Sequence, residues 1–241
     1  MRYAILSDIH GNLEALRAVL ADAADRADAI VCLGDVVGYG ADPDPCIELV
    51  AARCRVVVAG NHEYAVAARL DLEWFNPDAR AAAEWTRARL DDDACAWLAA
   101  LPLVGEVGDA TLVHASPGHP EDWDYLLEAE DGYAAFPAFA TRLCFVGHSH
   151  VPAVWAQGSW GREHEKGPAE IVIEAGCRYI VNVGSVGQPR DRDARAAYVV
   201  WDVEGRRVTL RRVPYDVARA RQKILDAGLP RFLADRLADG R

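Results

Sequence analysis

Five short apolar runs in this chain are each followed by aspartate, histidine or asparagine. The residues that follow them are Asp8-Ile9-His10-Gly11-Asn12, Gly34-Asp35, Gly60-Asn61-His62-Glu63, His114 and Gly147-His148-Ser149-His150. Each run is typical of a buried β-strand, and polar sites in α/β proteins collect at the carboxyl ends of strands. The pattern therefore favours a fold built on sheets, with these side chains gathered along one edge.

Strands and helices alternate in the first half of the chain, whereas short strands dominate the second half. Strands are predicted over 2–6, 29–33, 56–59, 110–113, 143–146, 153–157, 170–174, 179–183, 197–202 and 207–212, and helices over 12–24, 45–52, 63–69, 77–90, 92–101, 215–227 and 231–238. Residues 116–141 are expected to form a loop with short helices beside the site. This order predicts two packed sheets with helices outside. We expect one domain over residues 1–241, with helices from 215–239 packed on it.

The 241 residues carry a formal net charge of −11. A protein that binds duplex nucleic acid usually presents a basic face, so duplex DNA or RNA is not an expected partner. The same charge argues against binding to an anionic membrane surface. If the substrate is an anion, metal ions would supply the local positive charge.

Cysteine usage and the first residues of the chain bear on location. Six cysteines are scattered and none forms a C-x-x-C pair, so a zinc knuckle is not supported. The start, MRYAILSD, lacks the basic and apolar segments of a signal peptide, and no apolar run approaches the ~20 residues of a membrane span. A reduced cytoplasmic protein is expected.

Histidines at a spacing of two are the most specific local signal for metal binding. His148 and His150 can each reach a metal from one turn, and Asp8 and His10 point the same way in an extended stretch. Alternative interpretations are a helix cap for Asp8 and an ordinary loop residue for His10. Five of the seven histidines fall in the strand-end clusters; His119 and His164 lie in predicted loops and are given no role.

The remaining clusters are ambiguous when each is taken alone. Asp35 could bridge two metals or be an ordinary turn residue, and Asn61 could offer a carbonyl oxygen to a metal or cap a helix. His62 is expected to point away from its neighbour, which suits a proton donor. His114 could be a metal ligand or a histidine with structural partners at a strand end. Their recurrence after five strands favours the functional interpretation.

The ordered motifs D-x-H, G-D, G-N-H-E, H and G-H-x-H resemble those of the calcineurin-like metallophosphoesterase superfamily. The resemblance runs from Asp8 to His150 and on to about Asp202. It implies a four-layer αββα sandwich, in which two mixed β-sheets lie between layers of helices.

The resemblance also implies a set of ligands for two divalent ions. One ion would be held by Asp8, His10, Asp35 and His150, and the other by Asp35, Asn61, His114 and His148. Nitrogen and oxygen ligands without thiolate suit Mn, Fe, Zn or Ni. By this resemblance, a hydroxide that bridges the ions attacks phosphorus in line, and His62 protonates the leaving oxygen.

The sequence departs at two places from patterns found in other members of the superfamily, and the first departure argues against a protein phosphatase. Serine/threonine phosphatases of this superfamily carry G-D-x-x-D-R-G, whereas Gly34–Gly40 contains no arginine. Gly118 also follows His114-Ala115-Ser116-Pro117 where relatives often have a basic residue. Asp42–Pro45 and Asn182–Asp191 instead resemble the small prokaryotic phosphodiesterase branch.

Substrate contacts are less specific in the sequence. Arg190 is the candidate for a bidentate phosphate contact or else a surface arginine, and Asn12 and Tyr39 are assigned to substrate binding with it. Tyr39, Trp123 and Tyr125 are candidates for stacking on a nucleobase, although loop aromatics packed on the core are the more common case. The expected function is hydrolysis of small or nucleotide-like phosphodiesters. The alternatives are a phosphomonoesterase, a protein phosphatase or a dinucleotide polyphosphate hydrolase, and a non-catalytic scaffold; the oligomeric state is left open.

Overall fold

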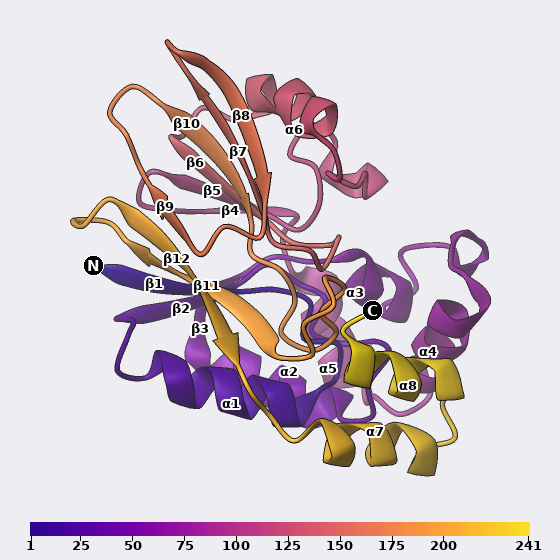
Figure 1. The fold of residues 1–241 in the computed structure, drawn as a ribbon. Coiled ribbons are helices and arrows are strands. Elements are labelled where there is room, and N and C mark those ends of the chain that lie inside the picture. The colour runs from indigo at the N-terminus through magenta and orange to yellow at the C-terminus, as the bar shows by residue number, and fades with distance from the viewer.

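Two six-stranded mixed β-sheets form the centre of the computed structural model, which describes residues 1–241 (Figure 1). The first sheet has the order β3 (Cys54–Val57), β2 (Ala29–Cys32), β1 (Arg2–Leu6), β11 (Ala196–Asp202), β12 (Arg207–Val213) and β9 (Glu170–Val172). The second has the order β4 (Val104–Val107), β5 (Ala110–Val113), β6 (Leu143–Val146), β10 (Arg178–Asn182), β7 (Ala153–Gly158) and β8 (Gly161–Lys166). The strands β1, β2 and β3 are parallel, as are β5, β6 and β10.

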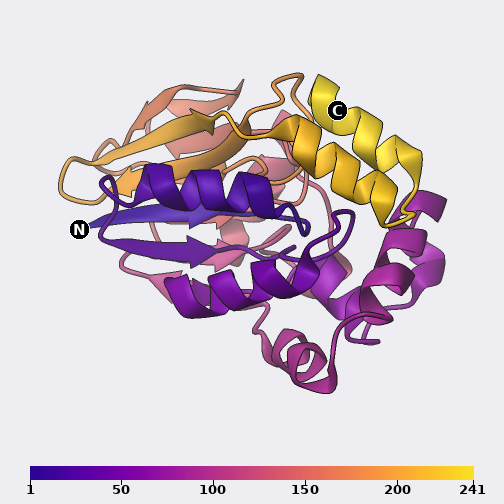
Figure 2. The ribbon, with the colours of Figure 1, turned by 90° about the horizontal axis from the view of Figure 1, so that it is seen from below.

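Helices cover the outer faces of the sheets, as Figure 2 shows for α1 and α2 beneath the first sheet. The α-helices are α1 (Leu13–Ala23), α2 (Pro43–Arg53), α3 (Asn61–Val66), α4 (Pro77–Arg87), α5 (Asp92–Ala100), α6 (Ala129–Ala135), α7 (Val217–Asp226) and α8 (Arg231–Asp239). Short 3₁₀ turns are η1 (Leu72–Trp74), η2 (Pro120–Asp122) and η3 (Phe136–Ala138). The predicted sandwich of two mixed sheets flanked by helices is confirmed.

Strand β1 illustrates why the apolar runs are continuous. Ala4 and Leu6 pack under α1, whereas Tyr3 and Ile5 pack between the two sheets. Successive side chains of a strand point to opposite faces, and here both faces are buried. Burial of a side chain such as Ile5 contributes roughly 1.5–3 kcal/mol, so the strands that carry the polar clusters are firmly held.

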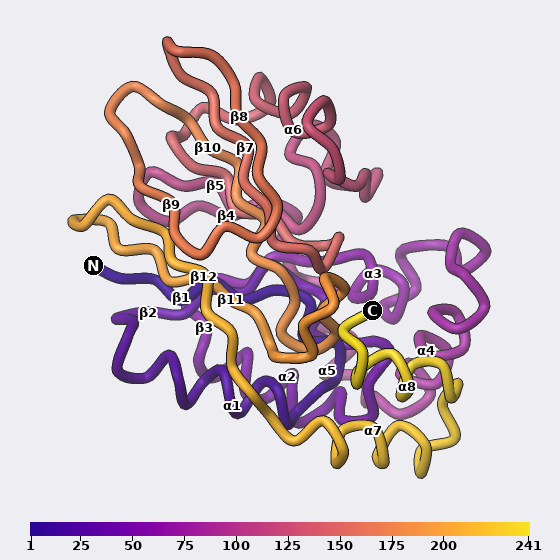
Figure 3. The backbone as a smooth tube through the Cα atoms, viewed as in Figure 1, coloured from indigo at the N-terminus to yellow at the C-terminus, as the bar shows by residue number.

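The C-terminal helices α7 and α8 lie beside α4, next to the loops at the carboxyl ends of β1 and β2 (Figure 3). Ile224, Leu233 and Leu237 from these helices pack in one apolar cluster with Ala82 of α4 and with Tyr39. The C-terminal segment therefore contributes to the position of Tyr39.

Two strands were not predicted. Strand β8 is exposed and mostly charged, so it lacks the apolar alternation of a half-buried strand, and β4 contains a glycine in four residues. His164 consequently lies in a strand, where its ring stacks on Trp155 at 4.7 Å, and not in a loop. The predicted loop with short helices over 116–141 is confirmed by η2, α6 and η3. No helix combines the length and apolar character that crossing a membrane would require.

Candidate metal centre

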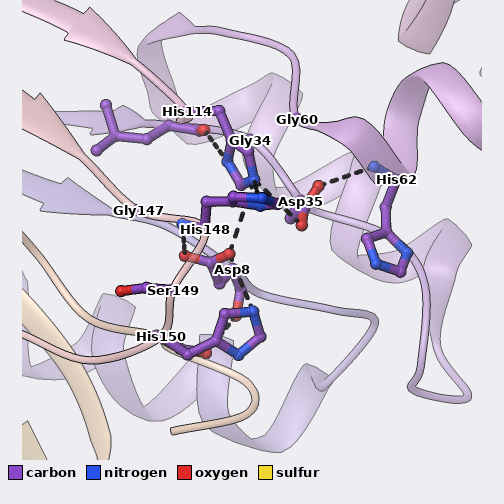
Figure 4. Close-up of polar contacts among 12 residues, drawn as sticks. Asp8, Gly34, Asp35, Gly60, His62, His114, Gly147, His148, Ser149 and His150 are labelled. Atoms are coloured by element: carbon purple, nitrogen blue, oxygen red, sulfur yellow. Dashed lines mark hydrogen bonds and ion pairs between the residues drawn. The ribbon is translucent and has the colours of Figure 1, made fainter. Parts of the chain in front are cut away.

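Residues from both sheets meet where their parallel strands end. The loops after β1, β2, β3, β5 and β6 supply the predicted ligands. Figure 4 shows Asp8, Asp35, His114, His148 and His150 pointing toward one another. Six predicted ligands are buried: Asp8, His10, Asp35, His114, His148 and His150. Side chains separated by up to 142 positions therefore share one site, because Asp8 comes from the first sheet and His150 from the second.

The first group consists of Asp8, His10, Asp35 and His150, whose ligand atoms lie within 4.8 Å of one another. His150 Nε2 is 3.2 Å from Asp8 Oδ1 and 3.1 Å from His10 Nε2. His10 Nε2 is also 3.6 Å from Asp35 Oδ2. Two carboxylates and two imidazoles thus converge on one point.

The second group consists of Asp35, His114 and His148, again within 4.8 Å. His114 Nε2 lies 3.3 Å from Asp35 Oδ2 and 3.1 Å from His148 Nδ1. Asn61 Oδ1 is buried and has no hydrogen-bond partner, and the helix N-cap is Gly60. Asp35 belongs to both groups, which is the placement that a bridging carboxylate needs.

Backbone carbonyls orient three of the imidazoles. The Nδ1 atoms of His10, His114 and His150 lie 3.1, 2.8 and 2.7 Å from carbonyl oxygens of the chain. Each Nδ1–H donates to its carbonyl, so each Nε2 points into the site, and the Nε2 atoms of His10 and His150, whose pKa values are lowered by burial, carry a lone pair. The Nε2 lone pairs of His10 and His150 then face each other at 3.1 Å, an arrangement that repels unless a cation lies between them.

Each carboxylate is held by one oxygen and presents the other. Asp8 Oδ2 accepts a hydrogen bond from the His148 backbone N–H at 3.1 Å, and Asp35 Oδ1 accepts one from the His62 backbone N–H at 3.0 Å. Asp8 Oδ1 is buried and has no hydrogen-bond partner. An unpaired buried carboxylate oxygen is costly, and a divalent cation would satisfy it.

The ligand loops adopt an uncommon backbone. Asp8, His10, Asp35, His148 and His150 all have positive φ, between 52° and 65°. Such left-handed conformations cost non-glycine residues free energy, although aspartate, asparagine and histidine tolerate them better than most. Because five predicted ligands share this conformation, we infer that it directs their side chains into the site.

Two glycines let the loops approach closely. A Cβ at Gly60 would lie 2.2 Å from Asp35 Oδ1, and one at Gly147 would lie 2.0 Å from Ser7 Oγ and 2.6 Å from Asp8 Oδ2. Any side chain at these two positions would displace the carboxylates.

Charge states in the cluster suit metal binding. Burial raises the pKa of Asp8 and Asp35, but His150 beside Asp8 and His114 beside Asp35 outweigh it, and both pKa values fall below the usual range. Burial lowers the pKa of His10 well below its ordinary value and that of His148 to about 3. Burial would also lower the pKa of His114, yet Asp35 raises it to about 9, so His114 holds a proton that a bound cation would displace.

The donor set therefore fits divalent ions. It combines ionised carboxylates, imidazole lone pairs and an unpartnered amide oxygen, and contains no thiolate. Nitrogen and oxygen ligands of this kind are typical of sites for divalent ions.

His62 lies to one side of the cluster (Figure 4). Its ring is 4.8 Å from that of His10 and 4.5 Å from that of Tyr39, and His62 Nδ1 has no hydrogen-bond partner. Burial lowers the pKa of His62 to about 4, against the opposing charge of Asp35. The imidazole is therefore neutral at pH 7 in the free protein, and only added negative charge beside it would favour protonation.

Glu63 is a positioning residue to which the sequence assigned no role. Its fully buried carboxylate accepts backbone hydrogen bonds from Asp35, Val36 and Gly60 at 2.7, 2.8 and 2.7 Å. The carboxylate thus joins the loop after β2 to the loop after β3. A glutamate three residues after the helix N-cap can accept from the N-cap N–H, as Glu63 does from Gly60, but this local signal does not reveal the contact with Asp35.

Glu63→Gln is expected to destabilise the protein by about 1–3 kcal/mol, because the new NH₂ group would face backbone N–H donors. It should also weaken metal binding roughly 10- to 100-fold, since Asp35 would lose its support. Thermal unfolding and metal titration at pH 8 would measure both effects. Glu84→Gln, at an exposed helical ion pair, is the control and should change stability by less than about 0.5 kcal/mol. A Glu63→Gln protein as stable as this control would contradict the assigned role.

The predicted substrate residues have different environments. Arg190 lies beside the site: its backbone N–H donates to His150 O at 3.2 Å and its guanidinium is 5.9 Å from the Tyr39 ring centroid. Asn12 instead donates to Gly187 O at 2.8 Å and accepts from Ala15 N at 3.1 Å. Both groups of its amide are used within the fold, so Asn12 caps α1 and its contacts give the predicted substrate role no support.

A cavity of about 430 Å³ opens beside the centre. Asn61, His62 and His148 line it together with Tyr39 and a group of loop residues. That group consists of Leu70, Trp74, Phe75, Asn76, Ala79, Glu121, Asp122, Trp123 and Tyr125. The sequence predicted Tyr39, Trp123 and Tyr125 as candidates for contact with the substrate. It gave no such prediction for Trp74 and Phe75, which lie in an acidic segment without a recognisable motif.

Known proteins resemble this chain along its whole length. A protein of Methanocaldococcus jannaschii described as uncharacterized is 39% identical, with 99% of this chain and 98% of the relative covered. The crystal structure of a metallophosphoesterase from Sphaerobacter thermophilus has 44% identity and a TM-score of 0.87, covering 100% and 99% of the two chains. A hypothetical protein from Pyrococcus horikoshii shares the fold at 22% identity and a TM-score of 0.81, covering 100% and 98%.

A family model described as calcineurin-like phosphoesterase matches residues 1–163, the part of the chain that carries all five ligand clusters. This match confirms the resemblance in the ordered motifs, from D-x-H to G-H-x-H. The chain therefore belongs to the calcineurin-like phosphoesterase family.

Proposed function

We propose that this metallophosphoesterase hydrolyses small or nucleotide-like phosphodiesters. The observation that carries the preference for diesters is the lining of the cavity beside the metal centre. It contains Glu121 and Asp122 but no lysine or arginine. A phosphodiester has one negative charge at neutral pH, whereas a phosphomonoester carries close to two. The acidic lining opposes the monoester more strongly.

In this proposal, two groups of side chains hold two divalent ions. Asp8, His10, Asp35 and His150 hold one, and Asp35, Asn61, His114 and His148 hold the other; these assignments rest on the distances and unpartnered atoms of the candidate centre. When bound, such ions supply an activated water and neutralise charge on the phosphoryl group. The metals are Mn, Fe, Zn or Ni, with Mn used as the first probe.

The other groups act on the substrate directly. Arg190 is the phosphate contact, because its guanidinium lies beside Tyr39 at the edge of the site and can bind two phosphoryl oxygens. His62 donates a proton to the leaving oxygen. The negative charge of the bound phosphate next to the ring opposes the effect of burial on the pKa of His62.

The context of the reaction is also a proposal. The substrate is a small phosphate ester and not duplex nucleic acid, since the chain has a net charge of −11. We place the reaction in the cytoplasm, because all six cysteines are free, as is usual in a reducing compartment.

Chelation is the direct test. Protein loaded with Mn²⁺ should cleave bis(p-nitrophenyl) phosphate, and EDTA should abolish the cleavage and lower Tm, because the ions bind the folded state. Dialysis into fresh Mn²⁺ should restore both. The diester should exceed p-nitrophenyl phosphate in kcat/KM by at least about tenfold, as expected for about 1.4 kcal/mol of discrimination. Faster cleavage of the monoester would contradict the diester assignment, and inertness with each of the four metals would contradict the function.

A further inference from the structure

Aromatic side chains from three segments surround the cavity beside the metal centre. Tyr39 follows β2, Trp74 and Phe75 lie between α3 and α4, and Trp123 and Tyr125 follow η2. Binding pockets for small molecules usually have 300–1,000 Å³, and this one, with about 430 Å³, is large enough for one ring system.

Trp74 is the most informative of these residues. The residue is 84% exposed, although it borders the cavity. The segment around it is anchored, because Leu72 and Phe75 pack on the core and Asn76 caps α4. A largely exposed tryptophan on a fixed turn contributes little to the core, so its ring is available to a ligand.

The other rings connect the cavity to the site. Tyr125 stacks on His148 with ring centroids 4.0 Å apart and planes at 17°, and Phe75 lies 5.0 Å from the His62 ring. Trp123 has a φ of 58°, a left-handed conformation that is uncommon for a bulky residue. The aromatic surface therefore begins at His148 and His62, beside the candidate metal centre, and extends outward to Trp74.

Charge limits what can enter. Glu121 and Asp122 are exposed at the cavity, so a second phosphate would be repelled there, whereas hydrogen-bond donors would be accepted. A flat neutral ring with amino groups meets both conditions.

From these observations we infer that the cavity is a stacking site for an uncharged aromatic group of the substrate, a nucleobase with an exocyclic amino group. The inference depends on the phosphodiesterase proposed above, because it names the group that such a substrate carries. Trp74 is its specificity-determining residue.

Binding of two product-like probes tests the inference without turnover. Calorimetric titration of the Mn²⁺-loaded protein should show AMP binding about tenfold more tightly than ribose 5-phosphate, which has the same phosphate but no base. Trp74→Ala should remove this difference and leave ribose 5-phosphate affinity within about twofold. Trp74→Phe, which keeps an aromatic ring, should retain most of the difference in affinity between AMP and ribose 5-phosphate. Trp160→Ala is the matched control, since Trp160 is 50% exposed at the distant β7–β8 turn.

AMP that binds no more tightly than ribose 5-phosphate, including the case in which neither binds, would overturn the inference. So would a Trp74→Ala protein that keeps the preference for AMP. Failure of the proposed function looks different: the protein would bind AMP through Trp74 yet cleave no phosphodiester with any metal.

Discussion

Asp35→Asn is expected to lower kcat/KM for bis(p-nitrophenyl) phosphate on the order of 10³-fold, because the variant would lose the carboxylate proposed to hold both ions, and a bound divalent ion is worth several kcal/mol of charge stabilisation. Asp35 lies in both ligand groups, with Oδ2 3.3 Å from His114 Nε2 and 3.6 Å from His10 Nε2. The amide has the same shape but no charge, so the variant should hold fewer metal ions per chain. Elemental analysis of dialysed protein would measure that loss beside the kinetics.

Asp44→Asn is the matched control for Asp35→Asn, because Asp44 is exposed in the first turn of α2. It should keep full metal content and activity. An Asp35→Asn protein that retains two ions and activity within about tenfold of the wild type would exclude a bridging role for Asp35.

His62→Gln should reduce kcat roughly 10²- to 10⁴-fold for a diester with an alkoxide leaving group, such as a nucleoside ester. The loss should be much smaller for a p-nitrophenyl ester, because p-nitrophenolate leaves without a proton. Metal content should be unchanged, since the His62 ring lies outside both ligand groups. Kinetics on the two esters, together with elemental analysis, would separate proton donation from metal binding.

His119→Gln, at an exposed loop histidine, is the control for His62→Gln and should behave like the wild type. Equal losses on both esters would argue against a proton donor at position 62. A loss of metal would assign His62 to the binding of ions.

The ligand clusters could be predicted because each follows an apolar run. Strand β6 is an example: Leu143 and Phe145 face the other sheet, and Cys144 and Val146 face η3 and its surroundings. Burial on both faces gives a continuous apolar stretch that can be recognised without knowledge of the partners. The polar residues after such a strand must emerge at the sheet edge, and this predicted the meeting of His148 and Asp8.

Contacts made across long sequence separations could not be predicted in this way. The hydrogen bond from the Gly60 N–H to Glu63 is local in sequence, but the hydrogen bond from the Asp35 backbone to Glu63 depends on how two loops pack. Strand β8 is charged and exposed, and its place in the sheet follows from pairing with β7. Trp74 borders the cavity together with residues far away in the sequence, such as Trp123 and Tyr125, and no local pattern indicates this contact.

Asp8, His10, Asp35, His148 and His150 have a left-handed backbone. This conformation places the side chains for metal binding but lowers the free energy of unfolding of the metal-free protein. Each of the five conformations costs a non-glycine residue about 1–3 kcal/mol, so this arrangement lowers the stability of the empty chain. Glycine in place of one of these residues would relieve its share of that strain while removing a ligand. Tolerance to heat is therefore a poor guide to function here: a variant that melts at a higher temperature without metal can be one that no longer binds it.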